Sequence, residues 1–83
     1  MKLESIFNIE LSRMPEGVPG RIGSLEAAST DRDRLEAMGL CVGRTVEVVR
    51  AGDPMIVRVL GTRIGLAAVL ARTVRVEADR GGW

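Results

Sequence analysis

The sequence contains no histidine, no tyrosine and a single cysteine among its 83 residues, and Phe7 and Trp83 are its only aromatic side chains. A single cysteine excludes an internal disulfide, which suits a reducing compartment, so we expect a cytoplasmic protein. Histidine is the usual general base at neutral pH, Cys41 has no residue to activate it, and no phosphate-binding loop of the GxxxxGK type is present. We therefore predict that the protein is not an enzyme and that it has no catalytic residue and no bound cofactor.

The scarcity of cysteine and histidine also argues against a tight transition-metal site. Thiolate and imidazole groups are the ligands that make such sites, which leaves mainly the carboxylates of Asp31, Asp33 and Glu36. Asp31 and Asp33 lie in the first turn of a predicted helix, where the helix dipole favours negative charge, so these two acids already have a structural role. We predict no metal-binding residue and interpret Cys41 as a small, partly buried apolar side chain.

The charges are balanced, with 12 Lys and Arg against 11 Asp and Glu, for a net charge of +1. Such a chain has no strong overall field to attract nucleic acid or an anionic membrane. Acidic residues stand where a signal peptide would be apolar, and no run approaches the roughly 18 apolar residues of a membrane span. We expect a soluble protein that does not insert into a membrane.

A small nucleic-acid-binding barrel remains an alternative because small barrels often bind RNA. Such surfaces use stacking aromatic side chains and basic grooves, and this chain has few aromatic residues. Several arginines alternate with apolar residues, so the solvent-facing side of a sheet explains them: Arg58, Arg63, Arg72 and Arg75. We therefore predict no nucleic-acid partner.

Apolar residues that alternate with polar ones predict several short strands. The alternating runs are RTVEVVRAG, PMIVRVLG, GTRIGLA and TVRVEA. The stretch GVPGRIGSLEA suits an earlier strand that bends or bulges at Gly20 or Gly23, and AAVLA suits a helical turn or a crossover. Near the amino terminus, SIFNIEL predicts either a short strand or an irregular lead-in.

We predict a mainly β fold, a small SH3-like barrel of about five antiparallel strands with one short inserted α-helix. Closure of the barrel would leave no exposed strand edge. The expected organisation is an N-terminal lead-in over residues 1–16, the barrel over residues 17–78 and a flexible tail over residues 79–83.

The inserted helix is predicted over residues 31–38. Thr30 suits the N-cap, and with Asp33 it has the spacing of a capping box. Gly39 suits the left-handed residue of a Schellman motif, in which Leu40 reaches back to Leu35. A helix of about two turns is too short to be stable alone in water, so we expect it to be held by packing.

Four pieces of the sequence resemble one known family. They are L-x-x-M-x-x-G-x-x-G-R-I (residues 11–22), R-L-x-x-M-G-L-x-x-G (34–43) followed by a V-x-V strand, G-T-R-I-G-L-A (61–67) and A-x-x-V-x-V (71–76). In this order and spacing they resemble the ferrous iron transport protein A family, FeoA.

The resemblance implies an SH3-like barrel that serves as a non-catalytic cytosolic accessory of bacterial ferrous iron uptake. Its implied partner is the soluble GTP-binding domain of the membrane permease FeoB. A related domain occurs in iron-dependent transcription repressors, so a regulatory domain of that type remains an alternative function.

Partner binding is predicted at Arg34, Met38, Leu40 and Met55. Core packing alone would also account for Met38 and Leu40, whereas flexible methionine side chains also suit adaptable binding surfaces. The segments expected to protrude are residues 34–42 and the turn at residues 53–55. We also leave open a weak homo-oligomer.

Overall fold

The alternating runs form strands of one antiparallel sheet, in a computed structural model that describes residues 6–79. In chain order the elements are β1 (Ile6–Glu10), the 3-10 helix η2 (Leu11–Arg13), β2 (Pro19–Leu25), α1 (Ser29–Ala37), β3 (Thr45–Arg50), β4 (Met55–Val59), β5 (Thr62–Leu66), α2 (Ala68–Ala71) and β6 (Val74–Asp79). The predicted mainly β fold is confirmed, with six strands instead of about five. The stretch AAVLA is the helical turn α2.

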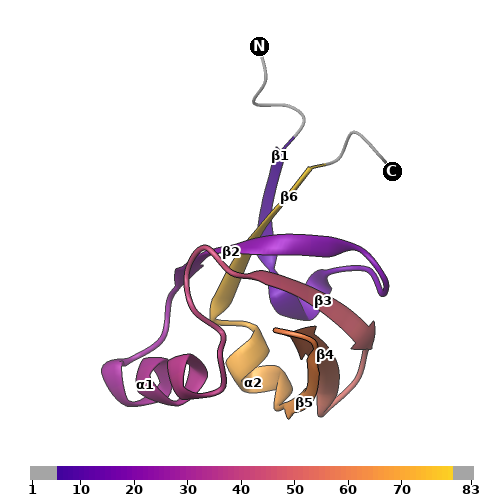
Figure 1. Cartoon of the computed structure of the whole chain (residues 1–83). Helices are drawn as coiled ribbons and strands as arrows, with labels where there is room; N and C mark the ends of the chain where they lie inside the picture. Colours follow the sequence, from indigo (N-terminus) through magenta and orange to yellow (C-terminus); the bar gives the residue numbers. More distant parts are fainter. Residues whose placement is uncertain (1–5, 80–83) are drawn as a thin grey trace.

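The strands follow the order β1-β6-β2-β3-β4-β5, and every neighbouring pair is antiparallel. Strands β1 and β6 rise side by side from the body of the domain, and α1 lies at the opposite end (Figure 1). Within residues 6–79, β1 and β5 each pair along one edge only. The prediction that closure would leave no strand edge is therefore wrong.

The barrel begins earlier than residue 17. Strand β1 pairs with β6, and Leu11 and Met14 are buried in the core. Residues 6–14 are therefore part of the sheet and its packing, while residues 1–5 of the predicted lead-in lie outside the described residues. Of the predicted tail, Asp79 ends β6 and residues 80–83 also lie outside the described range.

The core consists of aliphatic side chains from every strand that follows β1, from η2 and from both helices. Along β4, every second residue is buried and the residues between them are half-buried. The buried apolar residues are Leu11, Met14, Ile22, Leu25, Leu35, Leu40, Val46, Val48, Met55, Val57, Val59, Leu66, Ala71, Val74 and Val76. Burial of this apolar area is the main favourable term in folding.

Strand β2 bends where the sequence has glycines. Its register with β6 shifts between Ile22 and Ser24, which places a bulge at Gly23 as predicted. Gly20 is buried on the inner face, and a Cβ atom there would overlap the Cγ1 methyl of Val76. The inside of the curled sheet therefore has no room for a side chain at position 20.

Helix α1 starts at Ser29, two residues before the predicted start, and its N-cap is Ala28. The expected cap by Thr30 and the capping box with Asp33 are wrong, because both residues lie inside the helix. The beginning of α1 is instead tied to β2 by a tertiary contact. The Arg32 guanidinium donates a hydrogen bond from Nη2 to the carbonyl oxygen of Leu25, 3.1 Å away, at the end of β2.

The end of α1 is as predicted. Gly39 has a φ of +97°, its N–H donates to the carbonyl of Glu36 (3.0 Å), and the Leu40 N–H donates to the carbonyl of Leu35 (2.9 Å). These are the two hydrogen bonds of a Schellman motif. Leu35 is the only buried residue of α1, and Leu40 is buried beside the helix end. The helix is therefore held to the barrel mainly by these two leucines.

Replacing Leu35 by Ala should lower the free energy of unfolding by about 2–5 kcal/mol, because the substitution empties a fully buried site. Glu36→Ala, on the exposed side of the same helix, should change it by no more than about 0.5 kcal/mol. Urea unfolding of both variants checks this. A Leu35→Ala loss below about 1 kcal/mol would show that α1 is not held through Leu35.

Gly20→Ala should cost about 1–3 kcal/mol of stability, since the new methyl group collides with Val76 and the core must shift. Gly65→Ala is the matched control, because a Cβ atom there would meet only Ile56 and Pro54, each at 4.0 Å. Thermal unfolding should show a lower midpoint for the first variant alone. Equal midpoints would contradict the close approach of β2 and β6.

Candidate partner-binding surface

Helix α1 presents charged residues to solvent, and two of its arginines differ in what they contact. The Arg32 guanidinium donates a hydrogen bond to the carbonyl of Leu25, so it is engaged in a contact within the domain. The Arg34 side chain is 68% exposed, and its one ion pair among residues 6–79 is with Asp31, at 3.9 Å. An exposed pair at this distance contributes little to stability, so Arg34 remains available to a carboxylate of another molecule.

Of the two methionines predicted to bind a partner, only Met38 reaches the surface. Met38 is half-buried at the end of α1 and packs against the core, which leaves part of its side chain accessible. Met55 is 2% exposed and lies in phase with the inward residues Val57 and Val59 of β4. The expected direct contact of Met55 with a partner is therefore wrong.

The predicted contact of Leu40 with a partner is also wrong, because the exposed fraction of this residue is 0%. Its burial follows from the Schellman motif, which turns the residue after the glycine back toward the helix. Leu40 thus packs in the core beside the end of α1, and its side chain cannot contact another molecule.

The turn before β4 is exposed, but two of its polar groups form hydrogen bonds within the domain. Asp53 accepts a hydrogen bond at Oδ1 from the backbone N–H of Ala68 (3.0 Å), the first residue of α2. Glu16 accepts one at Oε2 from the backbone N–H of Ala51 (2.8 Å). The turn is therefore fastened to α2 and to the segment before β2.

A residue that sequence reasoning missed is Leu60, at the tip of the hairpin that joins β4 and β5. Its φ is +54° and that of Gly61 is +74°, as in a type I′ turn, and its side chain is 67% exposed. The Leu60 Cδ1 atom lies 3.6 Å from the position that a Cβ atom on Gly39 would take. The tip therefore adjoins the end of α1.

A shallow groove of about 220 Å³ runs beside this tip, on the outer side of the sheet. The residues that line it are Pro19, Thr45, Val46, Glu47, Arg58, Leu60 and Gly61. The Glu47 and Arg58 side chains form an ion pair across the groove, with 3.2 Å between Oε1 and Nη1. Two further hollows share or adjoin this surface and include Arg21 and Arg44.

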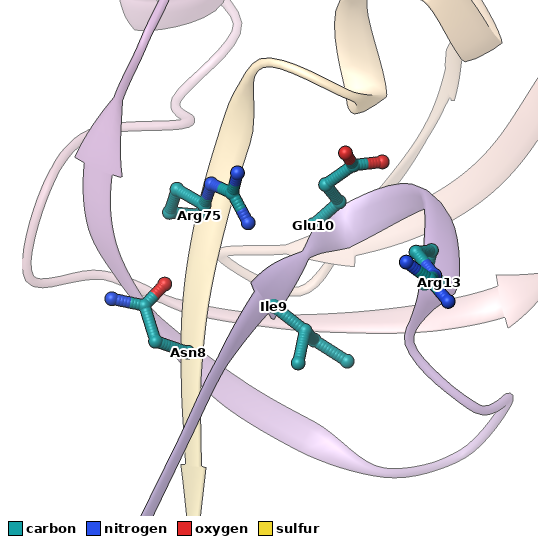
Figure 2. Close-up of a pocket in the computed structure, with 5 residues that line it drawn as sticks. All are labelled: Asn8, Ile9, Glu10, Arg13 and Arg75. Atoms are coloured by element: carbon teal, nitrogen blue, oxygen red, sulfur yellow. The ribbon is translucent and has the colours of Figure 1, made fainter.

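Another hollow, of about 340 Å³, lies along β1 and η2, away from the groove (Figure 2). Its lining residues are Asn8, Ile9, Glu10, Arg13 and Arg75. Two of these are committed elsewhere: Arg75 pairs through Nε with Glu26 (3.3 Å), and Glu10 accepts a hydrogen bond from Ser12 (2.9 Å). The ion pairs of Arg58 and Arg75 fit their interpretation as residues of a solvent-facing sheet surface.

Metal ligands do not gather at any of these hollows among the described residues. Among residues 6–79, no three side chains of His, Cys, Asp or Glu lie close enough together to hold one ion. Cys41 is half-buried, and its thiol lies 3.7 Å from the carbonyl oxygen of Glu36. Neither helix in the described part of the chain has the length and apolar content needed to span a membrane.

Comparisons with known proteins agree with this architecture. The model of the family described as the FeoA domain matches residues 9–78, from β1 to β6. No match was found among curated proteins.

Three solved structures resemble the chain closely. An iron uptake regulatory protein, FeoA, is 30% identical with a TM-score of 0.81, over 84% of this chain and 96% of that one. The iron(II) transport protein A of Clostridium thermocellum is 32% identical with a TM-score of 0.80, over 84% of this chain but only 45% of that one.

The third is the FeoA of Stenotrophomonas maltophilia in complex with zinc, described as a prokaryotic SH3 domain protein. It is 27% identical with a TM-score of 0.71, over 86% of this chain and 96% of that one. This likeness confirms the SH3-like fold, and the match of the family model from the end of β1 to β6 shows that the chain belongs to the FeoA domain family.

Proposed function

We propose that this protein is a non-catalytic cytoplasmic accessory of bacterial ferrous iron uptake, which docks on the soluble GTP-binding domain of a FeoB-type permease. Membership of the FeoA domain family, over residues 9–78, is the observation that carries the proposal. The relatives named for iron(II) transport and iron uptake regulation support the same process.

The surface of α1 supports docking by a polar contact. Arg34 is exposed, and within the described residues its ion pair is a long one to Asp31, so binding a partner's carboxylate would cost little within this domain. The accessible part of Met38 adds an adaptable apolar neighbour at the same helix end. A contact of this size suits a weak, transient interface of less than about 1,200 Å².

Arg34→Glu should weaken binding to the permease's soluble domain about tenfold or more, equivalent to about 1.4 kcal/mol, because the reversed charge repels the partner's carboxylate. Calorimetry with the two purified proteins measures the affinity, and ferrous iron uptake in cells should fall in parallel. Arg13→Glu, a charge reversal on η2, is the matched control and should bind as the parent does.

Both variants must unfold at the parent's midpoint for this comparison to hold. Equal affinity of the parent and a folded Arg34→Glu variant would show that α1 is not the docking element. Failure of the parent chain itself to bind the permease domain would contradict the proposed partner.

The isolated protein should bind ferrous iron no more tightly than an ordinary acidic surface does. The physical reason is the ligand set, since the sequence has no histidine and its single thiol lies beside a backbone carbonyl. Anaerobic calorimetry with ferrous iron alone should give no saturable heat at micromolar concentrations. A stoichiometric site would contradict this, and loss of that site in Cys41→Ser would identify its ligand.

A further inference from the structure

Leu60 is in a position for which neither turn geometry nor core packing requires a leucine. A two-residue hairpin of this type favours Asn-Gly, because both central residues take positive φ values. Leu60 adopts a φ of +54° and is nonetheless two-thirds exposed, so it contributes little to the core. An apolar side chain held in a strained conformation at a surface tip is a feature that partner contacts explain.

The hairpin tip lies between the end of α1 and the groove. On one side it adjoins Gly39, where α1 ends, and on the other it lines the groove with Pro19 and Thr45. An occupant of the groove would therefore touch Leu60, whose side chain in turn lies beside Gly39 just after α1. The hairpin tip thus connects the groove with the residues that follow α1.

Positive charge along this surface is only partly compensated. Arg58 lies opposite Arg63 in the register of β4 and β5, and like charges facing across strands are unfavourable. Glu47 pairs with Arg58, but Arg63 has no carboxylate oxygen within 4.0 Å among the described side chains.

The adjoining hollows add two more arginines that have no ion pair. Within the described part of the chain, Arg21 and Arg44 form no ion pair, and the buried Nε atom of Arg44 has no hydrogen-bond partner. The complementary occupant therefore carries negative charge.

We infer that the β4–β5 hairpin tip and the groove beside it bind an acidic segment of a protein partner. An apolar side chain of that segment packs on Leu60, and its carboxylates pair with Arg63 and with the arginines along the groove. In taking the permease's soluble domain as the source of this segment, the inference rests on the proposed function. A protein segment fits better than RNA, because the surface has an apolar anchor and none of its lining residues in the described part of the chain is aromatic, so bases have nothing to stack on there.

The decisive variant is Leu60→Asn, because asparagine suits the turn. Its unfolding midpoint should equal or exceed that of the parent, while its affinity for the permease domain should fall at least tenfold. Val69→Asn is the matched control, since Val69 on α2 is exposed to a similar extent (63%) and lies outside the groove. Arg63→Glu should reduce binding as Leu60→Asn does.

Methyl NMR of the full chain gives a second readout, with three probes titrated separately: the permease domain, a synthetic Asp/Glu peptide with one leucine, and a single-stranded RNA. The first two should shift the Leu60 methyl signals, and Arg63→Glu should abolish both shifts. If the permease domain does not bind but the peptide shifts Leu60, the surface stands and the proposed partner is wrong.

The remaining outcomes overturn the inference. If the permease domain binds parent and Leu60→Asn equally, the proposed function stands and docking at the hairpin is refuted. If neither the domain nor the peptide shifts Leu60, or if only RNA does, the acidic protein segment is refuted.

Discussion

The Val76 side chain occupies the space that any side chain at position 20 would need, and this close approach determines how the sheet curls. Strand β6 carries Val76 and pairs on both edges, with β1 and with β2, so it is the central strand of that half of the sheet. The glycine at position 20 lets β2 bend inward over β6, and the bulge at Gly23 completes the bend. The aliphatic core fills the space that this curvature encloses.

Local signals explain which parts of the fold the sequence predicts. Strict alternation identifies β3 to β6, and the pair Gly39 and Leu40 identifies the end of α1, because each signal lies within a few neighbouring residues. The start of α1 is different, since no side chain caps it and the Arg32 guanidinium ties its first turns to the Leu25 carbonyl, a contact that lies outside the helix. The sequence left strand β1 ambiguous for a similar reason: it forms by pairing with β6, whose residues lie far away along the chain, as in the partners Ile6 and Asp79.

The predicted partner-binding residues that proved wrong are those whose side chains are buried. Met55 is in phase with Val57 and Val59, so extending the alternation of β4 by one step would have placed it in the core. Leu40 must turn inward to complete the Schellman motif that the sequence itself predicts. Leu60 had a readable signal as well, a leucine before glycine between two alternating runs, where a polar turn residue is typical. Which arginines lack a partner depends on strand register, which residue type alone does not reveal.

The chain enters and leaves the described domain at one place. Ile6 and Asp79 are register partners at the ends of β1 and β6, and this end of the sheet lies opposite α1 and the hairpin region in Figure 1. Two strand ends about 5 Å apart can be spliced into a surface loop of a host protein without stretching either chain. The domain is thus suited to insertion as a cassette, with its α1 end turned away from the host. Joining these two ends by a short linker would likewise permit a circular permutant with new termini in a loop of choice.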